Sequence, residues 1–229
     1  SLPVADEAAP FSQGPAGGGN RAAQVFRERL ISEVRPTPEQ LAVIDGILEA
    51  SRERLRAERQ GASPEEIVFT SCGTESDSTA ILSAIQTYPE KNHVVTTRVE
   101  HPAVKNLCDN LEIFTGRKYH TTRLQVEADG TLDLQRFKDS LTDDTAIVSV
   151  MWANNETGVI FPVVEMAAIA RERGILFHTD AVQAVGKIPI NLRETAIDFL
   201  SISGHKLHAP KGFGVLYVRK GTPFVPFLN

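Results

Sequence analysis

The spacing of hydrophobic residues changes near residue 65 of this chain. Before that point, apolar residues recur at helical spacing from Leu41 to Leu55, and Thr37-Pro38 is a favourable helix start. We therefore expect a helix from about residue 37 to Gly61. Residues 1–20 are rich in Ala, Pro and Gly, and we expect them to form a loose arm.

From residue 65 onward, short apolar runs alternate with longer segments of helical spacing. The runs predicted as strands are 67–70, 94–97, 146–150, 175–178, 199–203 and 214–218. The segments predicted as helices are 76–88, 102–116 and 163–173. This alternation is typical of an α/β fold, a mostly parallel sheet with helices on both faces. We expect residues 1–36 to be a flexible or atypical N-terminal segment and residues 37–229 to form the domain that contains the sheet.

Composition narrows the class of protein only a little. The chain is 41% hydrophobic and 23% charged, which is ordinary for a globular protein, and its net charge of -5 argues against nucleic acid as a partner. No apolar run is long enough for a membrane span, and no secretory signal is recognisable. Cys72 and Cys108 are too few for a disulfide framework and lack the spacing of a zinc site. We therefore expect a cytoplasmic protein with free thiols and no metal.

A lysine follows the predicted strand 199–203 in the segment SISGHK. Partial desolvation at the rim of a sheet would favour the free amine of Lys206, which a Schiff base requires. Ser203 and His205 could donate hydrogen bonds to a phosphate. The alternative is that Lys206 is an ordinary surface lysine beside a polar turn.

A carboxylate follows the predicted strand 175–178. Asp180 at a strand end needs a cationic partner if it is buried, and a protonated pyridine nitrogen would serve. Gln183 lies one helical turn later and could reach the same ligand. The alternative is that Asp180 only caps the next helix.

Three further polar clusters follow predicted strands. Gly73 and Thr74 open a helix whose N-terminus would favour an anion, although a Gly-Thr turn is common. His101 precedes Pro102 at a helix start and could stack on an aromatic cofactor, or it could act only as a cap. In Asn154-Asn155, one amide could bind a ligand hydroxyl, or the pair could only order a loop. Together these clusters supply the groups of a pyridoxal 5'-phosphate (PLP) site.

Five segments then identify a family by resemblance: EEIVFTSCGTESDSTAIL, VEHPAV, MWANNETG, FHTDAVQAVGK and SISGHKLHAPKGFGVLYVR. In this order they closely resemble the NifS and IscS type of cysteine desulfurase, which are PLP-dependent enzymes of the class V aminotransferase family. The resemblance extends over about residues 48–226. It implies the large domain of PLP fold type I within residues 37–229, with the small C-terminal domain absent.

The resemblance also implies roles for individual residues. Lys206 would bind the cofactor covalently and move protons, and Asp180 would pair with the pyridine nitrogen. His101 would stack over the ring and assist acid–base steps. The remaining cofactor contacts would be Gly73, Thr74, Asn155, Gln183, Ser203 and His205. The implied reaction removes sulfur from L-cysteine and leaves L-alanine and a persulfide on an enzyme cysteine.

Partners and alternatives also follow from the resemblance. It implies a homodimer for the full-length parent, a sulfur-acceptor protein or iron–sulfur scaffold as partner, and a lean toward the NifS branch associated with nitrogen fixation. The family's nucleophilic cysteine lies on a loop in a region beyond Asn229, so we expect a fragment or a shortened relative. A related PLP lyase or aminotransferase, such as a selenocysteine lyase, and a catalytically silent binding protein remain as alternatives.

Overall fold

The structure is a computed structural model that describes residues 62–226. The expected loose arm over residues 1–20, the expected helix over 37–61 and the boundary at residue 36 all lie outside the described residues and stay predictions.

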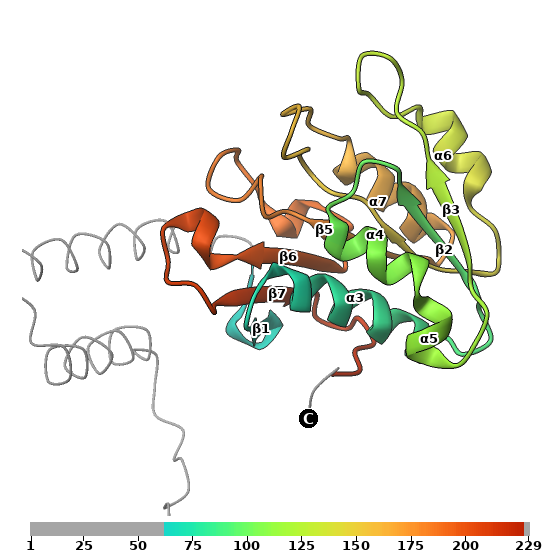
Figure 1. Cartoon of the computed structure of the whole chain (residues 1–229), viewed down its shortest axis with the longest axis horizontal. Helices are drawn as coiled ribbons and strands as arrows, with labels where there is room; N and C mark the ends of the chain where they lie inside the picture. Colours follow the sequence, from blue (N-terminus) through green and yellow to red (C-terminus); the bar gives the residue numbers. More distant parts are fainter. Residues whose placement is uncertain (1–61, 227–229) are drawn as a thin grey trace, which may run out of the picture. The chain divides into compact units, whose positions relative to one another are not determined.

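The described part of the chain is built on a seven-stranded sheet with the order β1-β7-β6-β5-β4-β2-β3 (Figure 1). The strands are β1 (Ile67–Thr70), β2 (His93–Thr97), β3 (His120–Leu124), β4 (Thr145–Ser149), β5 (Leu176–Asp180), β6 (Phe199–Ser203) and β7 (Gly214–Val218). From β3 through β6 all neighbours are parallel, whereas β7 is antiparallel to both β6 and β1. The prediction of a mostly parallel sheet is confirmed.

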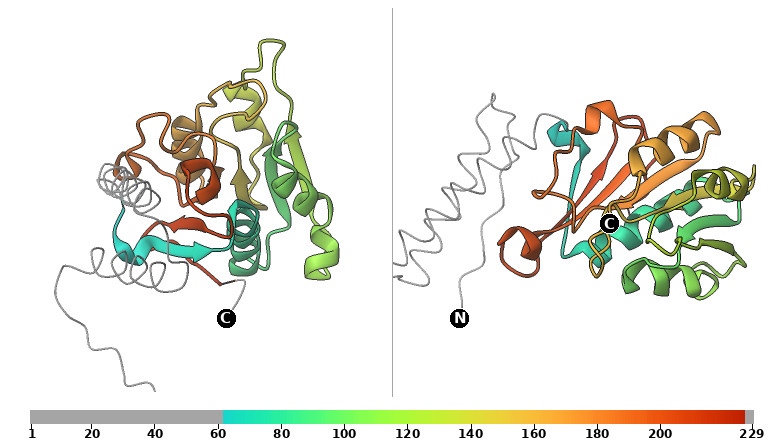
Figure 2. Two further views of the ribbon diagram at one scale, coloured as in Figure 1. Left: turned by 60° about the vertical axis from the view of Figure 1, so that its left-hand side comes forward. Right: turned by 90° about the horizontal axis from the view of Figure 1, so that it is seen from above.

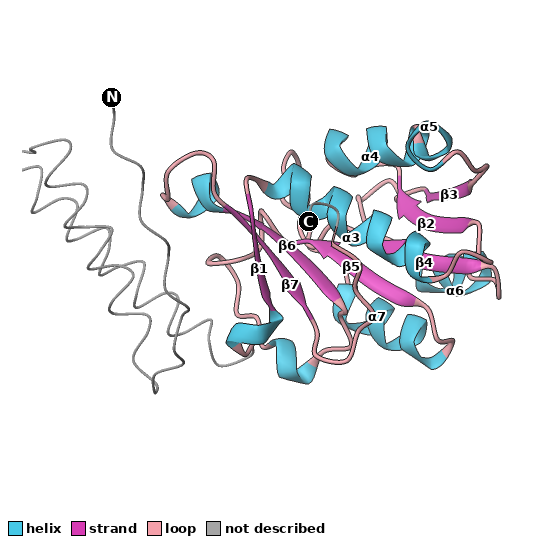
Figure 3. Cartoon of the chain, turned by 90° about the horizontal axis from the view of Figure 1, so that it is seen from below, coloured by secondary structure: helices cyan, strands magenta, loops and turns pink. Residues whose placement is uncertain are grey.

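Helices cover both faces of this sheet, as the views in Figures 2 and 3 show. The α-helices are α3 (Gly73–Thr87), α4 (Pro102–Asp109), α5 (Leu111–Thr115), α6 (Leu134–Ser140) and α7 (Val163–Glu172). Three short 3-10 helices are η1 (Pro64–Glu66), η2 (Leu192–Glu194) and η3 (Gly204–Leu207). Helices α3 and α4 lie on one face, and α6 and α7 lie on the other (Figure 3).

The alternation of side chains along the strands divides the core into two layers. Ile147, Leu176 and Phe199 belong to the apolar cluster beneath α3 and α4. The residues that follow them, such as Val148 and Phe177, belong to the cluster beneath α6 and α7. Because successive side chains of a strand point to opposite faces, a strand covered on both sides must be apolar at nearly every position.

The structure corrects three details of the expected elements. The single helix expected over 102–116 is broken at Asn110 into α4 and α5. Strand β3 and helix α6 were not expected at all. Asp180 is the last residue of β5, whereas the sequence pattern predicts that this strand ends at residue 178.

Candidate active site

The predicted site residues follow the carboxyl ends of parallel strands, as expected. Asp180 ends β5 and Ser203 ends β6. His101 lies between β2 and α4, and Asn155 follows β4. Because parallel strands end at one edge of the sheet, and the crevice outside that edge is where such folds bind ligands, these residues define the candidate active site.

Asp180 is a buried carboxylate that is 6% exposed. Its Oδ1 accepts a hydrogen bond of 2.9 Å from the backbone N–H of Val182. Burial raises the pKa of Asp180, while the Val182 N–H and the nearby His101 act in the opposite direction. Residues 182–187 form turns and not a helix. Asp180 therefore does not cap a helix, and its hydrogen bond to Val182 orders a turn instead. Within the described residues Oδ2 accepts no hydrogen bond, which leaves it available to a ligand.

Lys206 lies on η3, directly after β6 and therefore at the same edge as Asp180. Its side chain is exposed, so the partial desolvation expected from the sequence is not provided by the residues described here. The surface position that the alternative predicted is thus correct for Lys206 in this structure. Its role toward a cofactor stays a prediction.

The residues expected to hold a phosphate lie around the start of α3. A Cβ added to Gly73 would lie 3.1 Å from Val182 Cγ2 and 3.3 Å from Ser203 Cβ, so the helix start is closely packed against the ends of β5 and β6. Thr74 is exposed in the first turn. Ser203 Oγ lies 2.8 Å from His205 Nδ1. Hydroxyl groups, an imidazole and a helix N-terminus suit an anion.

Gly214 packs closely against the backbone that leads into α3. A Cβ added there would lie 2.6 Å from Thr70 Oγ1 and 2.7 Å from the backbone carbon of Cys72. The same Cys72 carbonyl accepts hydrogen bonds from Thr70 Oγ1 and from Ser76 Oγ, each at 3.2 Å. The backbone that leads into α3 is therefore fixed from two sides.

We expect Gly214→Ala to lower the free energy of unfolding by about 2 kcal/mol, because backbone atoms must move to admit the methyl group. Denaturant titration of both proteins measures this. Equal unfolding midpoints would show that the backbone at Cys72 can shift at little cost and does not fix the start of α3.

His101 acts as the cap that the alternative predicted. Its Nδ1 accepts a hydrogen bond of 3.2 Å from the backbone N–H of Ala103. The ring is exposed. The cap uses Nδ1 only, so Nε2 remains available. Capping α4 is therefore compatible with the predicted contact between His101 and a cofactor.

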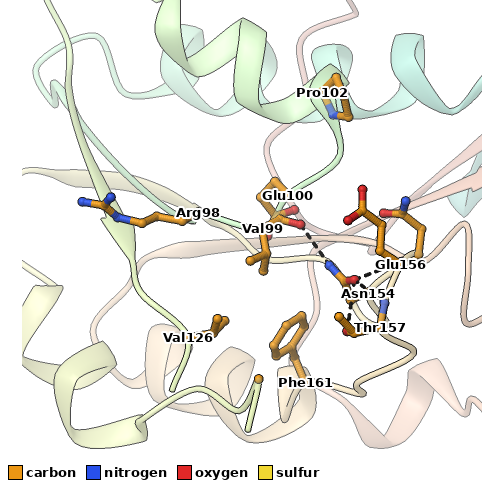
Figure 4. A pocket seen from close by; sticks show the side chains of 11 residues that line it. Arg98, Val99, Glu100, Pro102, Val126, Asn154, Glu156, Thr157 and Phe161 are labelled. Atoms are coloured by element: carbon orange, nitrogen blue, oxygen red, sulfur yellow. Dashed lines mark hydrogen bonds between the residues drawn. The ribbon is translucent and has the colours of Figure 1, made fainter. Parts of the chain in front are cut away.

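The two asparagines differ in burial and in contacts. Asn154 is buried, and its Oδ1 accepts from the backbone N–H groups of Glu156 and Thr157, so this residue orders the loop. Asn155 is exposed and lines a cavity of about 280 Å³ between the β2–α4 connection and this loop (Figure 4). Gln183 is half-buried, and its Oε1 accepts a 2.5 Å hydrogen bond from Lys187 Nζ.

Sequence reasoning missed three buried ionisable residues near the site. Glu100 precedes His101 and accepts from Met151 N–H at 3.0 and 3.1 Å and from Thr97 Oγ1 at 2.7 Å. Burial raises the pKa of Glu100 to about 8. Asp77 and His178 are buried beneath α3. A signal for Asp77 existed, because it lies four residues after Gly73 and hence on the same helix face.

The two cysteines differ in burial. Both are free thiols. Burial raises the pKa of Cys108 in α4 to about 12, so its thiolate is scarcely populated. Cys72 is half-buried at the start of α3.

Two negative findings concern residues 62–226 only. None of the helices in this range has the length and apolar character needed to cross a bilayer. The same range holds no cluster of three or more His, Cys, Asp or Glu side chains arranged to bind a metal ion.

The sheet order, the helices on both faces and the polar edge define the large-domain fold of PLP fold type I enzymes. The sequence model of the family "Aminotransferase class-V" matches residues 21–228. The chain therefore belongs to the class V aminotransferase family.

Within that family the similar proteins are cysteine desulfurases. The cysteine desulfurase NifS of Azotobacter vinelandii is 61% identical over 164 residues, which are 72% of this chain and 40% of that protein. The cysteine desulfurase of Gluconacetobacter diazotrophicus is 54% identical over 188 residues, 82% of this chain and 46% of that protein. The chain thus spans less than half the length of these relatives.

Solved structures support the same assignment of the fold. A NifS-like protein has a TM-score of 0.72 at 32% identity, covering 91% of this chain and 58% of the other. SspA in complex with cysteine has a TM-score of 0.72 at 32% identity, covering 93% of this chain and 61% of the other. The resemblance to NifS-type proteins inferred from the five sequence segments is confirmed.

Proposed function

We propose that this chain carries the PLP-binding core of a cysteine desulfurase. The observation that supports this proposal most is the buried carboxylate of Asp180, whose Oδ1 accepts from Val182 and whose Oδ2 is available to a ligand. It lies at the edge of the sheet where β6 ends and leads into η3, which contains Lys206. The names of its relatives favour a desulfurase over another lyase or aminotransferase of the same fold.

The donor set fits the chemistry of the cofactor. Asp180 would pair with the protonated ring nitrogen, which offsets the cost of burying its charge. Thr74, Ser203, His205 and the backbone at Gly73 would bind the phosphate. Asn155 and Gln183 would hydrogen-bond to the ring hydroxyl side or the substrate.

When bound, PLP supplies an electron sink for bonds at the substrate's α-carbon. Lys206 would hold the cofactor through its Nζ and then accept or donate protons beside the α-carbon. His101, whose Nδ1 is engaged as a cap, would use Nε2 for proton transfer. The cavity that Asn155 lines is also lined by Glu100 and Pro102, the two neighbours of His101 in the chain (Figure 4).

The substrate in this proposal is L-cysteine, which is also bound by the solved SspA relative. Its C–S bond breaks, the sulfur joins an enzyme thiolate as a persulfide, and the carbon skeleton leaves as L-alanine. The buried Cys108 is unsuited to receive the sulfur. The whole protein would act as a homodimer in the cytoplasm, a reducing compartment that suits its free thiols, and pass sulfur to an acceptor or iron–sulfur scaffold protein.

Incubation of the chain with PLP should produce the visible absorbance band of a lysine-bound cofactor, and Lys206→Ala should abolish that band. The exposed Lys211→Ala on the same loop is the matched control and should keep it. A band that survives in Lys206→Ala, or no band in the unchanged chain, would refute the proposal.

A further inference from the structure

The side chain of Glu100 continues the hydrogen bonding between β2 and β4 beyond the residues that pair. The last residues of these two strands that are paired in register are Val95 and Val148. Farther along, the backbone N–H of Met151 donates to the carboxyl of Glu100, with distances of 3.0 and 3.1 Å to its two oxygens. A side chain therefore supplies the acceptor for a buried N–H at a point where the neighbouring strand has ended.

Asn154 makes a second contact between the same two segments, in the opposite direction. Its Nδ2 donates a hydrogen bond of 3.1 Å to the backbone oxygen of Val99 (Figure 4). Its Oδ1 accepts from the N–H groups of Glu156 and Thr157 in its own loop. One amide therefore orders its loop and also connects that loop to the segment before α4.

These two contacts join the segment 97–101 to the loop 151–157, and we call them the inter-loop link. Each segment contributes one side chain and one backbone group. Glu100 is 7% exposed and Asn154 is 8% exposed, so water has little access to either hydrogen bond. Hydrogen bonds with so little access to water are strong, and breaking one leaves a buried polar group unpaired.

Both sides of the inter-loop link lead to predicted site residues. His101 and Asn155 are the next residues along the chain after the two linking side chains. The loop that begins at Met151 is also bonded to β5, because the N–H of Trp152 donates a 2.9 Å hydrogen bond to the backbone oxygen of Asp180. Hydrogen bonds thus join three segments that carry predicted cofactor contacts.

We propose that Glu100 and Asn154 are positioning residues that fix the segment of His101 against the loop of Asn155 and so set the width of the cavity between them. Both polar atoms of the Asn154 amide already have partners in the protein, so it acts through its neighbour and not by binding a ligand. The effect on the cofactor site rests on the proposed function, whereas the inter-loop link itself does not.

Substitutions of Glu100 test the link in the apo chain. Glu100→Leu removes both acceptor oxygens, whereas Glu100→Gln keeps one for the N–H of Met151. NMR should show that Glu100→Leu shifts the side-chain amide signals of Asn155, which lies on the other segment, and that Glu100→Gln largely restores them. Signals of Asn155 that stay unchanged in Glu100→Leu, or that shift equally in both variants, would overturn the proposal.

Asn154→Ser tests the link from the other side and does not depend on whether Glu100→Leu folds. A serine hydroxyl can still accept from backbone N–H groups within the loop, but it is too short to replace the donor to Val99. The ring signals of His101 should therefore shift in this variant. Asn110→Ser removes a similar amide-to-backbone bond, 2.7 Å long, at an exposed site and should leave these signals unchanged. Unchanged His101 signals in Asn154→Ser would contradict the link.

Cofactor affinity then tests the positioning role. Glu100→Leu and Asn154→Ser should each lower the affinity for PLP about tenfold, and Glu100→Gln should stay within about twofold of the unchanged chain. Phe137→Leu, a core change in α6 that leaves the hydrogen bonds of both loops in place, controls for lost stability and should keep the affinity. Unchanged affinity in both loop variants would overturn the positioning role. Failure of the unchanged chain to bind PLP would instead refute the proposed function and leave the NMR test of the link intact.

Discussion

Asp180→Asn should lower the affinity of the chain for PLP by about 100-fold, because an amide cannot form the ion pair with a protonated ring nitrogen. The amide oxygen can still accept the Val182 N–H, so the local turn should persist. Absorbance titration with the cofactor measures the change.

The stability of the apo variant separates this functional role from a structural one. Asp180 is 6% exposed and burial raises its pKa, so replacing it with a neutral amide should leave the apo protein as stable as before or slightly more stable. Glu156→Gln, which removes an exposed charge from the neighbouring loop, should affect neither quantity. Equal affinity in Asp180→Asn would contradict the proposed pairing.

Glu100→Gln should change the pH dependence of stability. The folded protein holds the proton of Glu100 more tightly than the unfolded chain does, because burial raises its pKa from 4.5 to about 8. The folded state therefore binds more protons between these values, and the free energy of unfolding falls as pH rises through this window. The loss from this residue is at most roughly 5 kcal/mol.

The measurable quantity is the difference in unfolding free energy between Glu100→Gln and the unchanged protein. This difference should move in favour of the variant as pH rises from about 5 to about 9, because a glutamine does not titrate. His178, whose pKa is lowered, is present in both proteins, so its contribution cancels. A difference that does not depend on pH would show that Glu100 is ionised throughout.

The buried strands were predictable because they are apolar at nearly every position. Strands β6 and β7 were predicted with the bounds that the structure gives them. Strand β3 was missed because it lies at the edge of the sheet and has the polar sequence HTTRL. Helix α6 is short and buries only Phe137, so it produces almost no periodic signal.

The candidate site was predictable to the extent that parallel topology brings strand ends together. That argument placed Asp180, Ser203 and His101 near one edge from the sequence. The burial of Asp77 and Glu100 could not be predicted. That of Asp77 depends on how α3 packs on the sheet, and that of Glu100 depends on its contact with Met151 after β4. The exposure of Lys206 is likewise set by tertiary surroundings.

Identifying the residue that binds the cofactor tests the proposed active site. The chain is incubated with PLP, reduced with borohydride and digested, and the modified peptide is identified by mass spectrometry. We predict that the cofactor label lies on Lys206. A label on Lys187 or Lys211, with Lys206 unmodified, would contradict the assignment of the active site.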